Sequence, residues 1–110
     1  MAGFIKGDIL KVRFPFTDFS QFAKRPSFVV KQVSPDDIIL CPITKSSGPH
    51  NTSIMIETTD FETGFLPHIS YIKINYPFTA DKSAVIKSIG KLKKKNTNEV
   101  IDKLCNYIKS

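Results

Sequence analysis

Hydrophobic and polar side chains alternate in residues 10–14, where the apolar residues are separated by Lys11 and Arg13. This period of two is typical of a strand with one face in a core and one in water. Pro15 follows, and proline has no N–H with which to extend a ladder of hydrogen bonds. The pattern predicts a first strand of about seven residues that ends near Phe14.

Later apolar segments predict further strands. Residues 28–30 and 38–43 flank the turn sequence SPDD at 34–37, so we expect a hairpin over residues 26–43. The remaining predicted elements are strands at 54–57, 69–74 and 84–92, the last broken by Gly90, and a turn around 60–64.

The period changes near the C-terminus. Apolar residues there recur at helical spacing, and Asn96 with Glu99 three residues later resembles a capping box. We therefore predict an amphipathic helix over residues 97–109. Five or six short strands and one terminal helix indicate a mainly β (α+β) fold, in which a small, strongly bent antiparallel sheet or barrel carries a C-terminal amphipathic helix.

The composition is that of a small globular protein. Its 110 residues suffice for one domain, which we assign to residues 1–110. No apolar run approaches the ~20 residues that span a bilayer, and the first residues lack the apolar block of a signal peptide. We therefore expect a cytoplasmic protein without membrane contact. Cys41 and Cys105 are far apart in the sequence, so we expect buried free thiols and neither a disulfide framework nor a zinc site.

Positive charge is concentrated in the last quarter of the chain. The formal net charge is +6; residues 1–81 contain eight Lys/Arg and eight Asp/Glu, whereas residues 82–110 contain eight lysines and two acids. Clustered lysines favour polyanions through counterion release, but a charge run is also common on a solvated face. Charge alone leaves open whether a nucleic acid is the partner.

Arg25 is the residue that we single out for phosphate chemistry. Pro26 favours an extended backbone at Arg25, so the guanidinium is held where loop becomes strand. Its planar fork can donate two parallel hydrogen bonds to a phosphate; a surface salt bridge to Asp18 or Asp36 is the alternative. Thr44 ends an apolar strand, so its hydroxyl can bond either a phosphate oxygen or an end-of-strand group.

Other sources of chemistry are few. The sequence has no Gly-rich phosphate loop, no HExxH, no GxSxG and no clustered His and Cys ligands, so we expect no cofactor and no metal. His50 and His68 lie in separate loop-like segments, and we predict that both are ordinary surface residues. Phe16, Phe19 and Phe22 are unusually apolar for a loop; they can stack on RNA bases, or fold back onto the barrel or a dimer partner.

A set of short motifs resembles the MazF/PemK toxins of bacterial toxin-antitoxin systems. The motifs keep their order and spacing over residues 7–92, and the helical tail fits the same family. They are GDIL-x-V (7–12), FPFTD (14–18), KRP followed by an apolar strand (24–30), ILCPIT (39–44), GFLPHISYIKIN (64–75), FTADKS (78–83) and IGKL (89–92).

The resemblance implies a fold, an activity and partners. The family has an SH3-like barrel with a C-terminal helix and works as a homodimer. Its members are sequence-selective endoribonucleases that cut single-stranded RNA without a metal, leave a 2′,3′-cyclic phosphate and a 5′-hydroxyl, and are silenced by a cognate antitoxin. We therefore expect single-stranded RNA as the substrate, and an antitoxin and a second copy of the chain as protein partners.

The resemblance also assigns roles to residues. It brings Arg25 and Thr44 together on the scissile phosphate as the catalytic pair, with Lys45 and Ser46 as further phosphate contacts. The other residues expected to bind substrate are Phe16, Asp18 and Lys24 in or beside the loop, and Ser70, Lys73 and Asn75 in the segment 70–75.

The general base is left open by the sequence. Some similar proteins carry an arginine and an aspartate where this chain has Lys73 and Asn75, with the aspartate as the proposed base, and an asparagine cannot hold a proton at neutral pH. Asp18, Glu57, a histidine and an unassisted 2′-hydroxyl all remain candidates.

Two other functions also stay open. One is a non-catalytic toxin of the same fold that inhibits DNA gyrase, which needs no base. The other is a non-enzymatic SH3-like RNA-binding module whose lysines only hold a polyanion.

Overall fold

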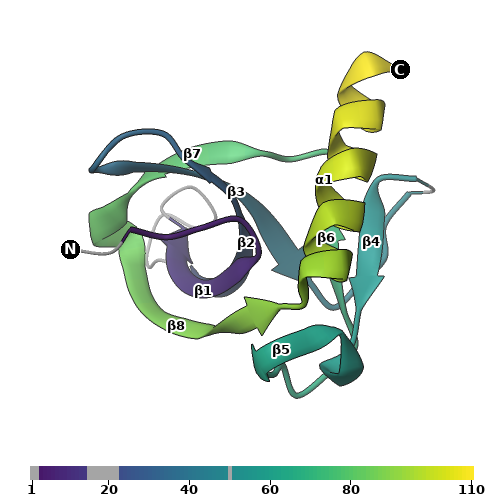
Figure 1. Cartoon of the computed structure of the whole chain (residues 1–110), viewed down its shortest axis with the longest axis horizontal. Helices are drawn as coiled ribbons and strands as arrows, with labels where there is room; N and C mark the ends of the chain where they lie inside the picture. The colour runs from purple at the N-terminus through teal and green to yellow at the C-terminus, as the bar shows by residue number, and fades with distance from the viewer. Residues whose placement is uncertain (1–2, 15–22, 50) are drawn as a thin grey trace.

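In the described part of the chain, eight antiparallel strands and one long helix make up the fold (Figure 1). The computed structural model describes residues 3–14, 23–49 and 51–110. The strands are β1 (Asp8–Phe14), β2 (Ala23–Gln32), β3 (Asp37–Thr44), β4 (Ser53–Ile56), β5 (Phe61–Gly64), β6 (Ser70–Lys73), β7 (Phe78–Asp81) and β8 (Val85–Leu92); the helices are α1 (Lys94–Lys109) and two 3₁₀ turns, Thr58–Asp60 and Lys82–Ala84.

The sheet curls into a half-barrel with α1 standing beside it (Figure 1). The strand order is β4-β6-β3-β2-β1-β8-β5, and β7 pairs with β3 on the edge that β3 also offers to β6. Neighbouring strands are antiparallel, as in the β2–β3 hairpin with its turn at residues 33–36. The predicted fold class, a strongly bent antiparallel barrel with a C-terminal amphipathic helix, is confirmed.

The central strands are buried on both faces, so buried and exposed residues do not alternate strictly along them. Leu10 and Val12 are fully buried and Arg13 is exposed, as the period of two predicts, but Ile9 is fully buried as well. Leu10 and Val12 belong to a small cluster that also contains Val29, and Ile9 belongs to a second, larger cluster. Curling the sheet therefore gives β1 and β2 an apolar layer on each side.

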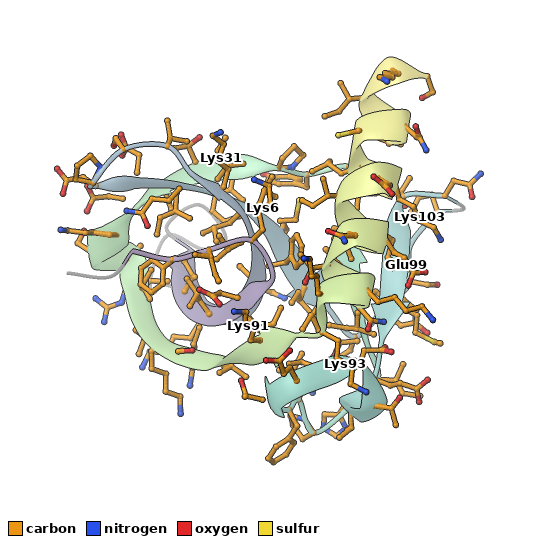
Figure 2. The ribbon with its side chains drawn as sticks, viewed as in Figure 1. Lys6, Lys31, Lys91, Lys93, Glu99 and Lys103 are labelled. Carbon is orange, nitrogen blue, oxygen red and sulfur yellow. The ribbon has the colours of Figure 1, made fainter. Side chains whose placement is uncertain are left out.

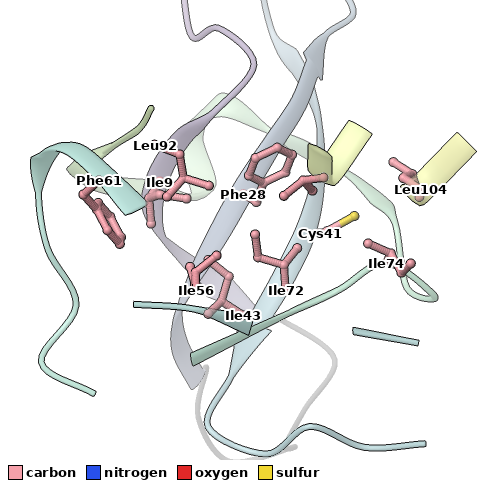
Figure 3. Close-up of a cluster of buried hydrophobic side chains, with 11 residues drawn as sticks. Ile9, Phe28, Cys41, Ile43, Ile56, Phe61, Ile72, Ile74, Leu92 and Leu104 are labelled. Atoms are coloured by element: carbon pink, nitrogen blue, oxygen red, sulfur yellow. The ribbon is translucent and has the colours of Figure 1, made fainter. Parts of the chain in front are cut away.

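The larger cluster fills the space between the sheet and α1 (Figure 3). Phe28 and Ile72 contribute from the sheet and are fully buried, and Val100 and Leu104 contribute from the helix. Burying an apolar side chain of this size stabilises the fold by about 1.5–3 kcal/mol. Docking of the helix thus depends on one apolar stripe.

Replacing Leu104 with alanine tests that docking. Leu104 is 4% exposed, and we expect its truncation to lower the free energy of unfolding by about 3 kcal/mol, because the cavity opens under the helix. Ile108, one turn further along the same helix, is 67% exposed, so Ile108→Ala is the matched control and should change stability by at most about 0.5 kcal/mol. Urea unfolding followed by circular dichroism measures both; equal losses would show that the helix does not dock through Leu104.

The helix begins three residues earlier than predicted. It starts at Lys94, and the residue before it, Lys93, makes no side-chain capping hydrogen bond. Asn96 is therefore inside the first turn, where its side-chain amide donates to the Asp60 carboxylate at 3.1 Å. The predicted capping box at Asn96 was wrong because this polar side chain serves a tertiary contact with the preceding part of the fold.

Two strands were missed by the sequence pattern, and one predicted interruption was wrong. β5 lies where a turn was predicted, and β7 is only four residues long. Gly90 lies inside an unbroken β8 and is opposite Gly64 of β5. The two strands approach so closely there that a Cβ on Gly90 would overlap the Thr63 carbonyl oxygen. The glycine is needed for strand contact rather than for a break.

The two cysteines differ in environment. Cys41 is fully buried in the larger cluster, and this burial raises the pKa of its thiol to about 12. Cys105 is exposed on α1, so the prediction of a buried thiol is correct for Cys41 and wrong for Cys105. Both thiols are free, as predicted. Over the described ranges, no helix combines the length and apolarity needed to cross a membrane.

Candidate functional site

An open cleft of about 650 Å³ lies where β2 begins, β3 ends and the chain enters β6. This volume is within the range of about 300–1,000 Å³ typical of ligand sites. We call it the strand-end cleft. It is lined by Lys24, Arg25, Pro26, Ile43, Thr44, Lys45, Ser46, Leu66, Pro67, His68 and Ser70.

Strand pairing brings Arg25 and Thr44 together. β2 and β3 are antiparallel, with Ser27 opposite Pro42. Arg25 and Thr44 lie two residues beyond this pair, near the start of β2 and at the end of β3. Both residues line the strand-end cleft, so two positions 19 apart in the sequence share one site.

The Arg25 side chain is exposed at the strand-end cleft. Asp36, one proposed salt-bridge partner, instead pairs with Lys82 at 3.4 Å. Asp18, the other, lies outside the described residues. Within the ranges that the structure covers, no carboxylate lies within ion-pair distance of Arg25. An uncompensated guanidinium at a cleft is suited to binding an anion.

Thr44 holds the turn that follows β3. Its hydroxyl donates a hydrogen bond of 2.8 Å to the Ser46 carbonyl oxygen. In this structure Thr44 therefore bonds an end-of-strand group, the second of the two partners expected for it. Lys45 and Ser46 are exposed and line the strand-end cleft. The hydroxyl of Thr44 can donate to a phosphate only by releasing Ser46, but it already fixes the backbone that carries Lys45.

His68 is a cleft residue that the sequence analysis had assigned to the ordinary surface. It is exposed and lies just before β6, and the Ser70 hydroxyl donates to the His68 carbonyl oxygen at 2.9 Å. Ser70 is 5% exposed, so this bond anchors the backbone of the segment. β6 pairs with the end of β3, where Thr44 is opposite Tyr71, which returns His68 to the same edge as Thr44.

Other predicted substrate-binding residues are not brought to the strand-end cleft. Lys73 is opposite Ser53 of β4, and neither Lys73 nor Asn75 lines the cleft. The side-chain oxygen of Asn75 is buried, without a hydrogen-bond partner among the described residues. Phe16 and Asp18, with Phe19 and Phe22, lie outside the residues that the structure describes. For these residues, substrate binding stays a prediction.

The strand-end cleft has a cationic side and an apolar side. Lys24, Arg25 and Lys45 supply positive charge, whereas Ile43 and Leu66 supply apolar surface. None of the described residues that line it is acidic. Positive charge beside apolar surface is the combination that binds a nucleotide, whose phosphate is anionic and whose base has a flat apolar face.

Fold and cleft together define a small β half-barrel protein with a cleft lined by cationic residues at the ends of its central strands. The sequence profile described as "PemK-like, MazF-like toxin of type II toxin-antitoxin system" matches residues 5–108. The chain therefore belongs to this toxin family, as the motifs indicated. A comparison with curated protein sequences found no significant match.

Solved structures with the same fold include mycobacterial toxins and endoribonucleases. The "Mycobacterium tuberculosis toxin MazF-mt6" aligns with a TM-score of 0.72 and 13% identity, over 93% of this chain and 96% of that one. An "Endoribonuclease in complex with its cognate antitoxin from Mycobacterial species" aligns with a TM-score of 0.73 and 13% identity, over 99% and 96%. An "Endoribonuclease from Mycobacterial species" aligns with a TM-score of 0.71 and 15% identity, over 99% of this chain and 94% of that one. At these identities the likeness is one of fold.

Proposed function

We propose that this chain is the toxin of a type II toxin-antitoxin system and acts as a metal-independent, sequence-selective endoribonuclease on single-stranded RNA. Membership of the PemK-like, MazF-like family supports the class of activity. The observation that carries the proposal is the convergence of Arg25, Thr44, Lys45 and His68 on one cleft. These side chains supply the charge and the proton-transfer group that RNA cleavage requires.

The proposed reaction uses the RNA's own nucleophile. The 2′-hydroxyl attacks the adjacent phosphorus, the bond to the 5′-oxygen breaks, and the products are a 2′,3′-cyclic phosphate and a 5′-hydroxyl. Negative charge grows on the phosphate oxygens, and Arg25 stabilises it through two parallel hydrogen bonds, with Lys45 as a second cation. Thr44 keeps Lys45 and Ser46 in place through its bond to the Ser46 carbonyl.

Proton transfer is assigned to His68. A histidine can take up and release a proton near neutral pH, and among the described residues it is the one cleft side chain of this kind. The Glu57 carboxylate, another candidate base, is not among the described residues that line the cleft. Asp18 stays a prediction, because it lies outside the described residues.

Substrate grip is divided between the two sides of the cleft. We assign the flanking phosphates to Lys24 and Ser46, and a base to the apolar side at Ile43 and Leu66. Ser70 acts by holding the backbone of His68. Phe16 and Asp18, with Lys73 and Asn75, are proposed to extend the RNA site.

The partners follow from the same proposal. One structural neighbour is an endoribonuclease solved with its cognate antitoxin. We propose that an antitoxin silences this chain as well, and that the active form is a cytoplasmic homodimer. Exposed apolar side chains such as Phe65 (61%) and Ile69 (53%), beside the cleft segment 66–70, are suited to such contacts.

The ends of the RNA fragments test the proposed function. Purified protein is incubated with a defined single-stranded RNA in excess EDTA, and the fragments are mapped by sequencing and mass spectrometry. We expect cuts at a short recurring sequence, with 2′,3′-cyclic phosphate and 5′-hydroxyl ends. RNA that is bound but stays intact would favour the non-enzymatic RNA-binding module, and DNA breaks that depend on gyrase would favour the gyrase inhibitor.

A further inference from the structure

A second cavity, of about 670 Å³, lies at the other end of β2 from the strand-end cleft. Four lysines from four parts of the chain line it: Lys6 from the N-terminal segment, Lys31 from β2, Lys91 from β8 and Lys94 from the start of α1. Figure 2 shows Lys6, Lys31 and Lys91 on the barrel to the left of α1. We call it the lysine cavity.

The positive charge of the lysine cavity is almost unopposed. Glu62 is the one acid among its described lining residues, and in the described part of the chain none of the four lysines has an ion-pair partner within 4.0 Å. Like charges that share a cavity repel one another, and the single carboxylate of Glu62 offsets only part of this repulsion. An anionic ligand would offset the rest.

Hydrogen-bond donors face the same cavity. The α1 N-terminus has no side-chain cap and no acidic residue in its first turn, so its backbone N–H groups are available to an anion. Thr97, also in the lining, is 7% exposed, and its hydroxyl has no hydrogen-bond partner among the described residues. Thr97 adds a side-chain hydroxyl to the lysines and the helix N-terminus that border the cavity.

The kind of cation indicates the kind of anion. All the cationic residues of the lysine cavity are lysines, which bind phosphate as point charges and impose little orientation, whereas arginine provides the planar fork that pairs with carboxylates. Contacts of this kind suit a nucleic-acid backbone, which they hold without reading its sequence. An acidic peptide fits less well.

The lysine cavity and the strand-end cleft lie at opposite ends of β2. Lys31 is six residues along β2 from Arg25, which corresponds to at most about 20 Å at about 3.3 Å per residue. We propose that the lysine cavity binds the phosphodiester backbone of single-stranded RNA outside the cleavage site. This proposal depends on the proposed function in one respect only, namely that single-stranded RNA is the substrate. The cavity raises affinity for long RNA without choosing the cut.

Binding of an RNA that cannot be cut tests the lysine cavity independently of cleavage. The probe is a fluorescent 18-nucleotide 2′-O-methyl RNA of mixed sequence, and anisotropy gives its Kd between 50 and 300 mM NaCl. For single-stranded nucleic acids, the logarithm of the binding constant falls with the logarithm of the salt concentration, and each phosphate contact contributes about 0.7 to this slope. For K6Q/K31Q/K91Q we therefore expect a slope smaller by about 2 and an affinity at least about 10-fold lower at 100 mM salt.

A matched variant removes the same charge elsewhere. Lys87, Lys103 and Lys109 are exposed and line neither cavity. K87Q/K103Q/K109Q should bind the probe within about twofold of the unaltered chain. Equal effects of the two triple variants, or no effect of either, would overturn the proposal. So would a loss confined to binding of a 12-residue oligoglutamate peptide, because the cavity would then serve acidic peptides.

Replacing Glu62, the one acid among the described lining residues, makes the lysine cavity more positive and keeps all four lysines, so RNA binding should become tighter rather than weaker. Glu62→Gln should tighten binding of the 2′-O-methyl probe about threefold, and Glu99→Gln, on an exposed face of α1, should leave it unchanged. Unchanged binding in Glu62→Gln would overturn the proposal even if a triple variant did not fold. Cleavage of a short RNA by K6Q/K31Q/K91Q should continue, which separates this site from the proposed catalytic cleft.

Discussion

Replacing Arg25 with alanine is expected to lower the rate of RNA cleavage about 10³-fold, or about 4 kcal/mol of transition-state stabilisation. The guanidinium is exposed at the strand-end cleft without a carboxylate partner in the described residues, so no structural ion pair is lost with it. The loss should appear in kcat under saturating RNA, because the charge that Arg25 meets is larger in the transition state than in the bound substrate. Single-turnover cleavage of a mapped RNA measures it.

Two further variants show whether charge or geometry is at work. Arg25→Lys keeps the charge and loses the fork, so we expect a rate between those of the unaltered chain and Arg25→Ala. Lys87→Ala removes one positive charge from an exposed position of β8 outside the cleft and should cleave normally. Full activity in Arg25→Ala would remove Arg25 from the chemistry. Equal losses in Arg25→Ala and Lys87→Ala would reduce its role to general attraction of RNA.

The meeting of Arg25 and Thr44 was expected from the family resemblance, whereas the hairpin over residues 26–43 was predicted from the turn sequence at 34–37 and the apolar runs on either side. The turn alone does not fix the register of β2 and β3, because the register shifts between Val29 and Lys31 before Ser27 comes to lie opposite Pro42. The polar character of residues 44–46 also marked the end of β3 and the cleft beside it.

His68 was missed because its place depends on contacts that are distant in the sequence. It reaches the cleft only because β6 adds to the edge of β3, and the Ser70 hydroxyl then fixes the turn before β6. A single histidine after a proline in the short segment at 65–69 gives no periodic signal of its own. β5 was missed for the same reason, since its pairing depends on the close approach of Gly64 and Gly90.

Replacing His68 with glutamine is expected to slow cleavage about 10²-fold, in line with the contribution of one acid or base. Glutamine keeps a polar side chain of similar length but exchanges no proton at neutral pH. The segment itself should keep its shape, because its anchor is the bond from the Ser70 hydroxyl to the His68 backbone carbonyl. One limb of the plot of log rate against pH should flatten in His68→Gln, the acid limb if His68 is the base and the alkaline limb if it is the acid; a merely structural role would lower the rate and leave the profile unchanged.

A modified substrate shows which proton His68 handles. If the 5′-oxygen that leaves is replaced by sulfur, the leaving group is a thiolate, which needs no general acid because thiols ionise far more readily than alcohols. As the acid, His68 would be dispensable for this substrate, and His68→Gln should cut it at nearly the unaltered rate. As the base that takes the 2′-hydroxyl proton, it would still be required, and the defect of about 10²-fold should persist. Cleavage of the ordinary RNA by His68→Gln at the full rate would exclude both roles and leave the 2′-hydroxyl to be activated by another group.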